Sequence, residues 1–157
     1  MVAVFLYPAK RPKTLRLKFK KREYSATMAK LFIQFAAFSG ALAVMIGAFG
    51  AHALKARLTP ELLSVYETGV QYHFWHTLVL LAVGLLALQL PDSRALMASG
   101  IAFIVGIILF SGSLYLLAST DIRHLGFMPV GLITPFGGMS FIVGWLLLLI
   151  SSFKISS

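Results

Sequence analysis

The chain has 157 residues, of which 59% are hydrophobic and only 12% are charged, and its mean hydropathy is +0.87. This composition excludes an ordinary soluble domain, which needs far more polar surface to face water. The sequence has no cysteine, which excludes disulfides, thiolate metal sites and thiol nucleophiles, and its net charge of +9 points to an anionic partner.

The charged residues avoid four long stretches of the sequence. No Asp, Glu, Lys or Arg occurs in residues 31–54, 68–91, 95–120 and 124–153. A hydrocarbon core about 30 Å thick needs roughly 20 apolar residues per helix, and each stretch is long enough. The stretches also lack the alternating pattern of a membrane barrel. We therefore predict an all-α fold, an integral membrane bundle of four transmembrane helices.

Most of the positive charge lies before the first of these stretches. Residues 1–27 carry eight of the 14 Lys and Arg side chains against a single acid, Glu23. A basic segment next to a first span is typical of a cytoplasmic anchor that contacts anionic lipid. The segment has no recognisable nucleic-acid-binding motif, so we expect the lipid bilayer, and no nucleic acid, as its partner.

Two other interpretations of residues 1–27 have to be considered. Met28-Ala29-Lys30 resembles the start of a membrane protein. We therefore expect residues 1–27 to be a basic extension that is either not native or is disordered, ahead of a four-helix domain at 28–157. The basic segment, the apolar run and Ala51-His52-Ala53 also satisfy the loose cleavage rule of a signal peptide. We discount the signal peptide, because its apolar run is longer than usual and three more spans follow.

The first predicted span, residues 31–53, carries small residues at helical spacing. Gly40, Ala43 and Gly47 form a stripe that allows close approach of another helix backbone. We interpret the stripe as a helix–helix contact surface rather than a ligand groove. The same pattern is typical of helices that self-associate in membranes.

The second and third spans are predicted to form an antiparallel hairpin. Thr59-Pro60-Glu61 combines a hydroxyl N-cap, a proline at the first helical position and an acid in the first turn. The helix that begins there is expected to continue into the second span, residues 70–90. The tight polar turn at 91–94 then leads into the third span, residues 95–118.

Prolines and glycines interrupt the start of the fourth apolar stretch. Pro129, Thr134-Pro135 and Gly137-Gly138 argue against a continuous helix through this region. We therefore expect the last helix to cover residues 134–151, with Thr134 as its N-cap. The broken segment is expected to face the protein interior, because irregular backbone in a membrane must be satisfied by protein groups or water.

Three histidines form the most specific cluster of chemically active residues. His52 ends the first span, and His73 and His76 lie three residues apart at the start of the second, so all three are expected near one membrane face. Together they are candidate ligands for Zn²⁺ or Cu²⁺, or candidate proton carriers. The alternative that we favour is that they are boundary histidines bonded to carbonyls, to Glu67 or to each other.

Catalysis and ion transport have little support in the sequence. No carboxylate lies inside any span, although cation transport usually needs an ionisable residue at membrane depth. Ser111 and Ser113 have no evident His and Asp partners, and no cofactor motif is visible, so no cofactor is expected.

The orientation depends on where translation starts. With residues 1–27 counted, the even number of spans and the positive-inside rule place both termini in the cytoplasm. Without them, the Lys and Arg count is equal on the two sides, and charge leaves the orientation undecided. The residues are Lys30, Arg94 and Lys154 on the terminal side and Lys55, Arg57 and Arg123 on the other.

Four motifs, taken together, make the chain resemble a known family. In chain order they are residues 47–52, residues 68–73 leading to His76, residues 110–115, and residues 134–138 with Gly144-Trp145. Over about Lys30 to Lys154 the chain is similar to the YwdK/YgdD family of small four-span inner-membrane proteins, whose function is unknown. The resemblance implies a multi-pass protein of the inner membrane and supplies no catalytic residues.

These observations together lead to two functional expectations. We expect a non-enzymatic structural or accessory bundle in the membrane. The alternative is a small transporter, or a metal- or proton-handling membrane protein, that uses His52, His73 and His76.

Overall fold

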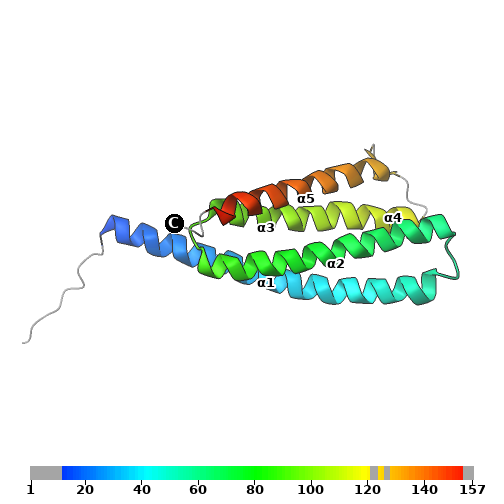
Figure 1. Cartoon of the computed structure of the whole chain (residues 1–157), viewed down its shortest axis with the longest axis horizontal. Coiled ribbons are helices and arrows are strands. Elements are labelled where there is room, and N and C mark those ends of the chain that lie inside the picture. The colour runs from blue at the N-terminus through cyan, green and yellow to red at the C-terminus, as the bar shows by residue number, and fades with distance from the viewer. Residues whose placement is uncertain (1–11, 121–123, 126–127, 154–157) are drawn as a thin grey trace, which may run out of the picture.

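The computed structural model describes residues 12–120, 124–125 and 128–153, and it is a bundle of four long helical segments (Figure 1). Each segment is long and apolar enough to cross a membrane. The predicted all-α, four-span fold is therefore confirmed. The elements are α1 (Lys13–Phe49), the π-helix η1 (Gly50–Leu54), α2 (Pro60–Gln89), α3 (Arg94–Gly106), the π-helix η2 (Ile107–Ser111), α4 (Gly112–Ser119), β1 (His124–Leu125), β2 (Met128–Pro129) and α5 (Val130–Ser152).

The spans are arranged so that α2 and the third span, α3–η2–α4, lie between α1 and α5 (Figure 1). α1 packs along α2, α2 packs along the third span, and the third span packs along α5. The two short strands form an antiparallel pair in the link before α5. The N-terminal part of α1, the α2–α3 turn and the end of α5 all lie at the same end of the bundle.

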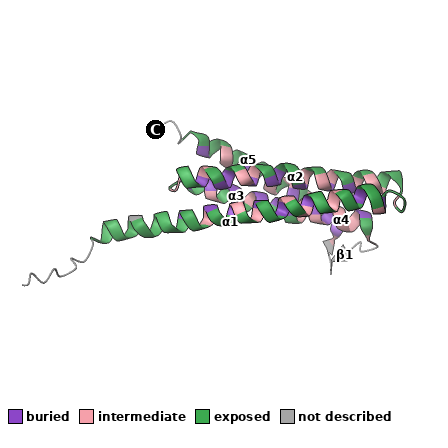
Figure 2. Ribbon diagram, turned by 90° about the horizontal axis from the view of Figure 1, so that it is seen from below, coloured by how far each residue is buried: buried purple, intermediate pink, exposed green. Residues whose placement is uncertain are grey.

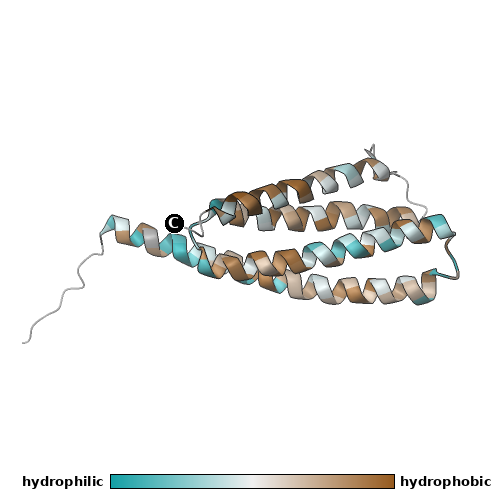
Figure 3. Cartoon of the chain, in the orientation of Figure 1, coloured by the Kyte–Doolittle hydropathy of each residue, from teal (hydrophilic) through white to brown (hydrophobic). Residues whose placement is uncertain are grey.

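The N-terminal part of α1 extends beyond the bundle. α1 and η1 form one helical segment of 42 residues, which at 1.5 Å per residue is roughly 63 Å long, about twice the hydrocarbon thickness. Most residues of its first turns are exposed and many are hydrophilic (Figures 2 and 3). Residues 13–27 continue the helix of the first span, and residues 1–11 lie outside the described part, so the expectation for residues 1–27 stays a prediction.

Two hydroxyl caps fix where the second and third spans begin. Thr59 Oγ1 accepts a hydrogen bond of 3.4 Å from the Leu62 N–H, with Pro60 at the first helical position, as predicted. Ser93 Oγ accepts a bond of 3.3 Å from the Leu96 N–H and so starts α3 directly after the turn. The helix from Pro60 runs without interruption to Gln89, which confirms that it continues into the second span.

Small residues bring α1 and α2 together along their length. Ala36 and Ala43 are buried, and a Cβ added at Gly40 or Gly47 would contact a side chain of α2. Near the other end, a Cβ added at Gly84 would lie 3.1 Å from the backbone of Ile33. The predicted contact surface of the first span is confirmed, and its partner is α2 of the same chain.

The start of α5 differs from the prediction. α5 is helical from Val130, so the break expected at 129–138 does not exist, and Pro135 lies inside the helix. A proline affects the carbonyl four residues earlier, which here belongs to Gly131, an exposed residue in the first turn of the helix with open space beside it. Thr134 does not cap the helix; its hydroxyl lies 2.7 Å from that of Ser113 on α4.

At Gly137, α5 lies close to the backbone of the third span. A Cβ added there would overlap the backbone of Phe110, whereas one added at Gly138 would meet only the Phe110 ring, at 3.8 Å. Close backbone contact supplies much of the packing energy between membrane helices, because lipid gives no hydrophobic force between them. The crowded position of this glycine pair is therefore Gly137.

We predict that Gly137→Ala lowers the free energy of unfolding by about 1–3 kcal/mol, because the added methyl group must push α5 away from Phe110. Gly138→Ala is the matched control, and we expect it to be neutral or slightly stabilising because alanine favours helix. Unfolding of both variants in detergent, followed by circular dichroism, measures the difference. Equal stability of the two variants would contradict this packing.

Candidate functional site

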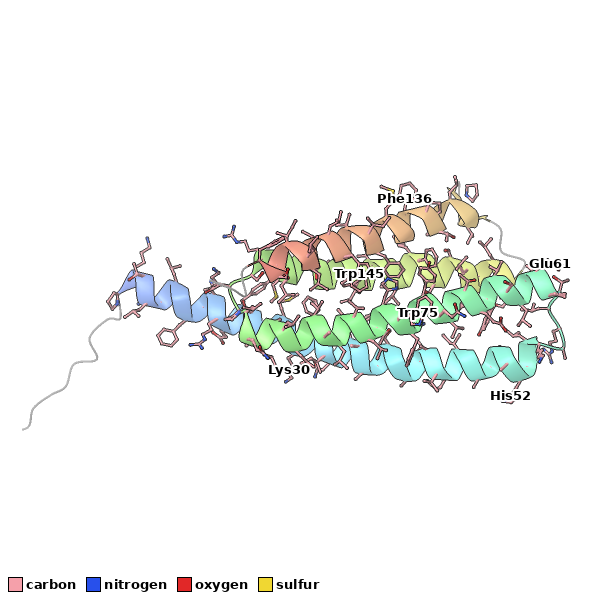
Figure 4. All side chains as sticks on the ribbon, viewed as in Figure 1. Lys30, His52, Glu61, Trp75, Phe136 and Trp145 are labelled. Carbon is pink, nitrogen blue, oxygen red and sulfur yellow. The ribbon has the colours of Figure 1, made fainter. Side chains whose placement is uncertain are left out.

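The structure separates the three histidines that the sequence places together. His52 is exposed on η1 at one end of the bundle, whereas His73 and His76 are buried about midway along α2. Figure 4 shows His52 at that end and Trp75, which lies between the other two histidines in sequence, near the middle of the bundle. Among the described residues, no three His, Asp or Glu side chains are close enough to hold one metal ion. The structure therefore does not bring the predicted three-histidine set together.

His73 is the centre of a buried hydrogen-bonded network that joins three spans. Its Nε2 lies 2.9 Å from Ser39 Oγ on α1, and its Nδ1 lies 3.1 Å from the hydroxyl of Tyr115 on α4. Ser39 Oγ also lies 2.8 Å from Thr77 Oγ1, one turn further along α2. His73, Ser39 and Thr77 are each at most 4% exposed. The network cross-links α1, α2 and α4 at membrane depth.

His76 joins α2 to α5, and its two ring nitrogens have different partners. Nδ1 lies 2.8 Å from the Tyr72 carbonyl, so it carries the proton and donates. Nε2 lies 3.4 Å from Nε1 of Trp145, an indole that can only donate, so Nε2 accepts. The imidazole also stacks on Phe141, with 3.5 Å between ring centroids. These contacts specify a neutral His76 with its proton on Nδ1.

Aromatic rings fill the space between α2, the third span and α5 around His76. Tyr72 lies 4.6 Å from Phe110 between ring centroids, and Phe103 meets Trp145 edge to face at 5.6 Å. Trp145 therefore packs between helices, although 48% of it is exposed. Rings of this size bridge a gap between α2 and α5 that smaller side chains cannot span.

Two serines of the third span behave differently from each other. Ser113 Oγ donates to the Phe110 carbonyl at 2.8 Å or pairs with Thr134, which ties α4 to α5. The hydroxyl of Ser111 is buried and has no partner among the described residues, and the same is true of Ser99. Ser113 is therefore a cross-link between α4 and α5.

An apolar cavity of about 260 Å³ lies between α1 and the third span, next to the His73 network. Ser39, His73 and Tyr115 are the only residues of its wall with polar side chains. A Cβ added at Gly112 would meet nothing within 4 Å, so the missing side chain leaves this space open. The remaining wall residues are Phe35, Phe38, Leu42, Ile46, Ile107 and Ile108.

The chemistry available to this site is limited by how its groups are already bonded. Ser39 and His73 have the hydrogen bond of a nucleophile and its general base. The residue that orients His73 is, however, a tyrosine rather than a carboxylate, and Ser39 also binds Thr77. In this arrangement both nitrogens of both buried histidines are within hydrogen-bond distance of protein groups.

The sequence alone does not single out Ser39 or the role of Tyr115. Ser39 is an isolated hydroxyl within the small-residue stripe of the first span, and that position next to Gly40 is the signal that could have identified it. Thr77 is also buried and belongs to the network, whereas Gln34, another uncharged polar residue of the spans, is exposed.

Comparison with known proteins identifies similar chains of the same size. Residues 46–138 match a family model described as a protein of unknown function, DUF423. The UPF0382 membrane protein YwdK of Bacillus subtilis is 42% identical over 125 residues, which is 80% of this chain and 98% of the relative. The UPF0382 inner membrane protein YgdD of Escherichia coli is 36% identical over 127 residues, which is 81% of this chain and 92% of the relative. No solved structure matches the chain.

We predict that Ser39→Ala lowers the free energy of unfolding by about 1–2 kcal/mol, because His73 and Thr77 lose a buried partner. Ser119→Ala is the matched control: its hydroxyl is exposed and bonds only within its own helix, so a change below about 0.5 kcal/mol is expected. Unfolding in detergent tests both. A network that carries no stability would leave the two variants indistinguishable.

Proposed function

The chain belongs to the DUF423 family of UPF0382 membrane proteins, and on that premise we propose that this multi-pass membrane protein is a non-enzymatic structural or accessory bundle. The observation that carries the proposal is the bonding of His73 and His76. A metal needs an imidazole nitrogen with a free lone pair. Here each nitrogen faces a group of the protein, so the histidines serve as links between helices.

The distribution of charge supports the same proposal. The acids of the described spans lie near their ends, as Glu61 and Glu67 do in the first turns of α2. A transported cation would have to cross the bundle beside neutral side chains alone, and this is costly in a low-dielectric interior. This charge distribution agrees with an accessory role, which requires no ion pathway through the bundle.

The location that we propose is the inner membrane, with both termini in the cytoplasm. The Escherichia coli relative bears the name of an inner membrane protein. The N-terminal part of α1 and the α2–α3 turn share one end of the bundle (Figure 1), and residues 13–27 with Arg94 hold seven of the 14 Lys and Arg residues, against Lys55 and Arg57 after η1. An excess of positive charge at one end favours the cytoplasmic side.

A second candidate function, proton handling, rests on one specific feature. Tyr115, His73, Ser39 and Thr77 form a continuous chain of hydrogen-bonding groups, and imidazole and hydroxyl groups can pass a proton along such a chain. This series of hydrogen-bonding groups covers only a few helical turns at the middle of the bundle. To conduct protons across the membrane, the series would need additional proton-carrying groups toward both membrane faces.

We predict that the purified protein, placed in liposomes with a pH gradient, dissipates that gradient no faster than protein-free liposomes do. We also expect less than one equivalent of Zn or Cu per chain by elemental analysis after purification in detergent. Both results follow if the imidazoles are structural. Faster dissipation that His73→Asn abolishes and Ser119→Ala leaves intact would replace the accessory role with proton handling.

A cellular test complements the measurements in liposomes. A deletion strain profiled across metal, pH and osmotic stress supplies a phenotype, and the parent gene restores it. We expect His73→Asn to restore it as well whenever its level in the membrane equals that of the parent. Failure at equal level would show that the imidazole has a chemical role.

A further inference from the structure

A second cavity, partly polar, lies away from the His73 network, at the end of the bundle where the N-terminal part of α1 meets the α2–α3 turn. It measures about 380 Å³. Its polar side is formed by Lys21 and Ser25 of α1 and by Ser93 and Arg94 at the start of α3. Its other side is apolar and consists of Met97, Ala98 and Ile101, with the ring of Tyr24.

Two contacts hold α1 in place beside this turn. Ser25 Oγ donates a hydrogen bond to the Pro91 carbonyl, and Ser25 is only 3% exposed. Lys21 Nζ lies 2.8 Å from a carboxylate oxygen of Asp92. The basic helix is therefore docked against the bundle, and the cavity has a defined wall on each side.

The electrostatic balance of the cavity is positive. Lys21 and Arg94 supply two positive charges against the single carboxylate of Asp92, which Lys21 already contacts. Lys20 and Arg22 flank Lys21 on the same helix and are exposed. Arginine is suited to this role because its planar guanidinium binds phosphate through two hydrogen bonds.

The apolar side continues from the charged groups along the third span. Arg94, Ala98 and Ile101 lie three to four residues apart on α3, so they share one face of the helix. Ile101 is 48% exposed and Tyr24 is 60% exposed. A tyrosine between basic groups and an apolar helix face is typical of the boundary between headgroups and hydrocarbon.

We propose that this cavity binds an anionic phospholipid. Its phosphate lies between Arg94, Lys21 and the hydroxyl of Ser93, which accepts from the Leu96 N–H and keeps its own proton to donate, and the upper part of one acyl chain runs over Ala98 and Ile101. The apolar side favours a lipid over free phosphate, because free phosphate gains nothing from an apolar wall. The site goes beyond the accessory role proposed above and gives the bundle a preference for the lipid that surrounds it.

The test is competition between two lipids for the full-length protein. The protein is purified in mixed micelles with equal amounts of phosphatidylglycerol and phosphatidylcholine, which have similar chains but differ in headgroup charge. Native mass spectrometry then counts each lipid retained. We expect phosphatidylglycerol to be retained about fivefold or more over phosphatidylcholine, as about one basic contact supplies.

Two exposed arginines at opposite ends of the bundle provide the matched variants. Arg94→Gln is expected to reduce the preference for phosphatidylglycerol at least threefold, and Arg57→Gln, which removes the same charge after η1, is expected to leave it unchanged. Asp92→Asn removes the opposing carboxylate and should preserve or increase the preference. The measurement does not depend on histidine chemistry, so its failure and the failure of the accessory role are distinguishable.

Three outcomes would overturn the lipid site. Equal retention of the two lipids would show that the cavity does not distinguish them by headgroup charge. Equal losses in Arg94→Gln and Arg57→Gln would show that only the overall charge matters. Full displacement of phosphatidylglycerol by millimolar inorganic phosphate would show that the cavity is an anion site without a lipid component.

Discussion

Contact between helix backbones and large side chains at glycine positions is the constraint on which the rest of this bundle depends. Within lipid the helices gain no hydrophobic energy by associating, so close packing and hydrogen bonds must hold them together. Gly84 brings α2 against α1, and Gly137 brings α5 against Phe110. The close pairs leave gaps between α2 and α5, which Tyr72, His76 and the surrounding rings fill. Buried polar groups such as Ser39, His73 and Thr77 then pair with one another, because the membrane interior offers no water to satisfy them.

The sequence predicts the fold well because the bilayer imposes simple rules on length and charge. Four charge-free stretches give four spans, and the cap at Thr59 begins a helix where its residue type indicates. The start of α5 is the main error. Pro135 is tolerated because the carbonyl that it disturbs belongs to Gly131, an exposed residue in the first turn of the helix. Residue-type rules for proline and glycine do not predict the position of such a residue within a helix or the groups that pack against it.

The candidate site is less predictable, because it is built from residues that are distant in sequence. The spacing of His73 and His76 indicates a shared region of α2, but their partners Ser39, Tyr115 and Trp145 come from three other segments. His52 is close to them in the expected topology and remote in the structure, because η1 ends the first span well beyond the level of His73. A pairing across helices depends on rotation and register, and neither is encoded in a local motif.

The central claim, that the buried histidines link helices, is tested most directly by the protonation state of His76. Nitrogen-15 NMR of the ¹⁵N-histidine-labelled protein in detergent micelles distinguishes the two neutral tautomers from the charged ring, and a His76→Gln variant assigns the signal. Donation to the Tyr72 carbonyl and acceptance from Trp145 predict a neutral ring protonated on Nδ1 at pH 7. Trp145→Phe should change that signal and leave His73 unaffected. An imidazolium, or a ring protonated on Nε2, would contradict the account.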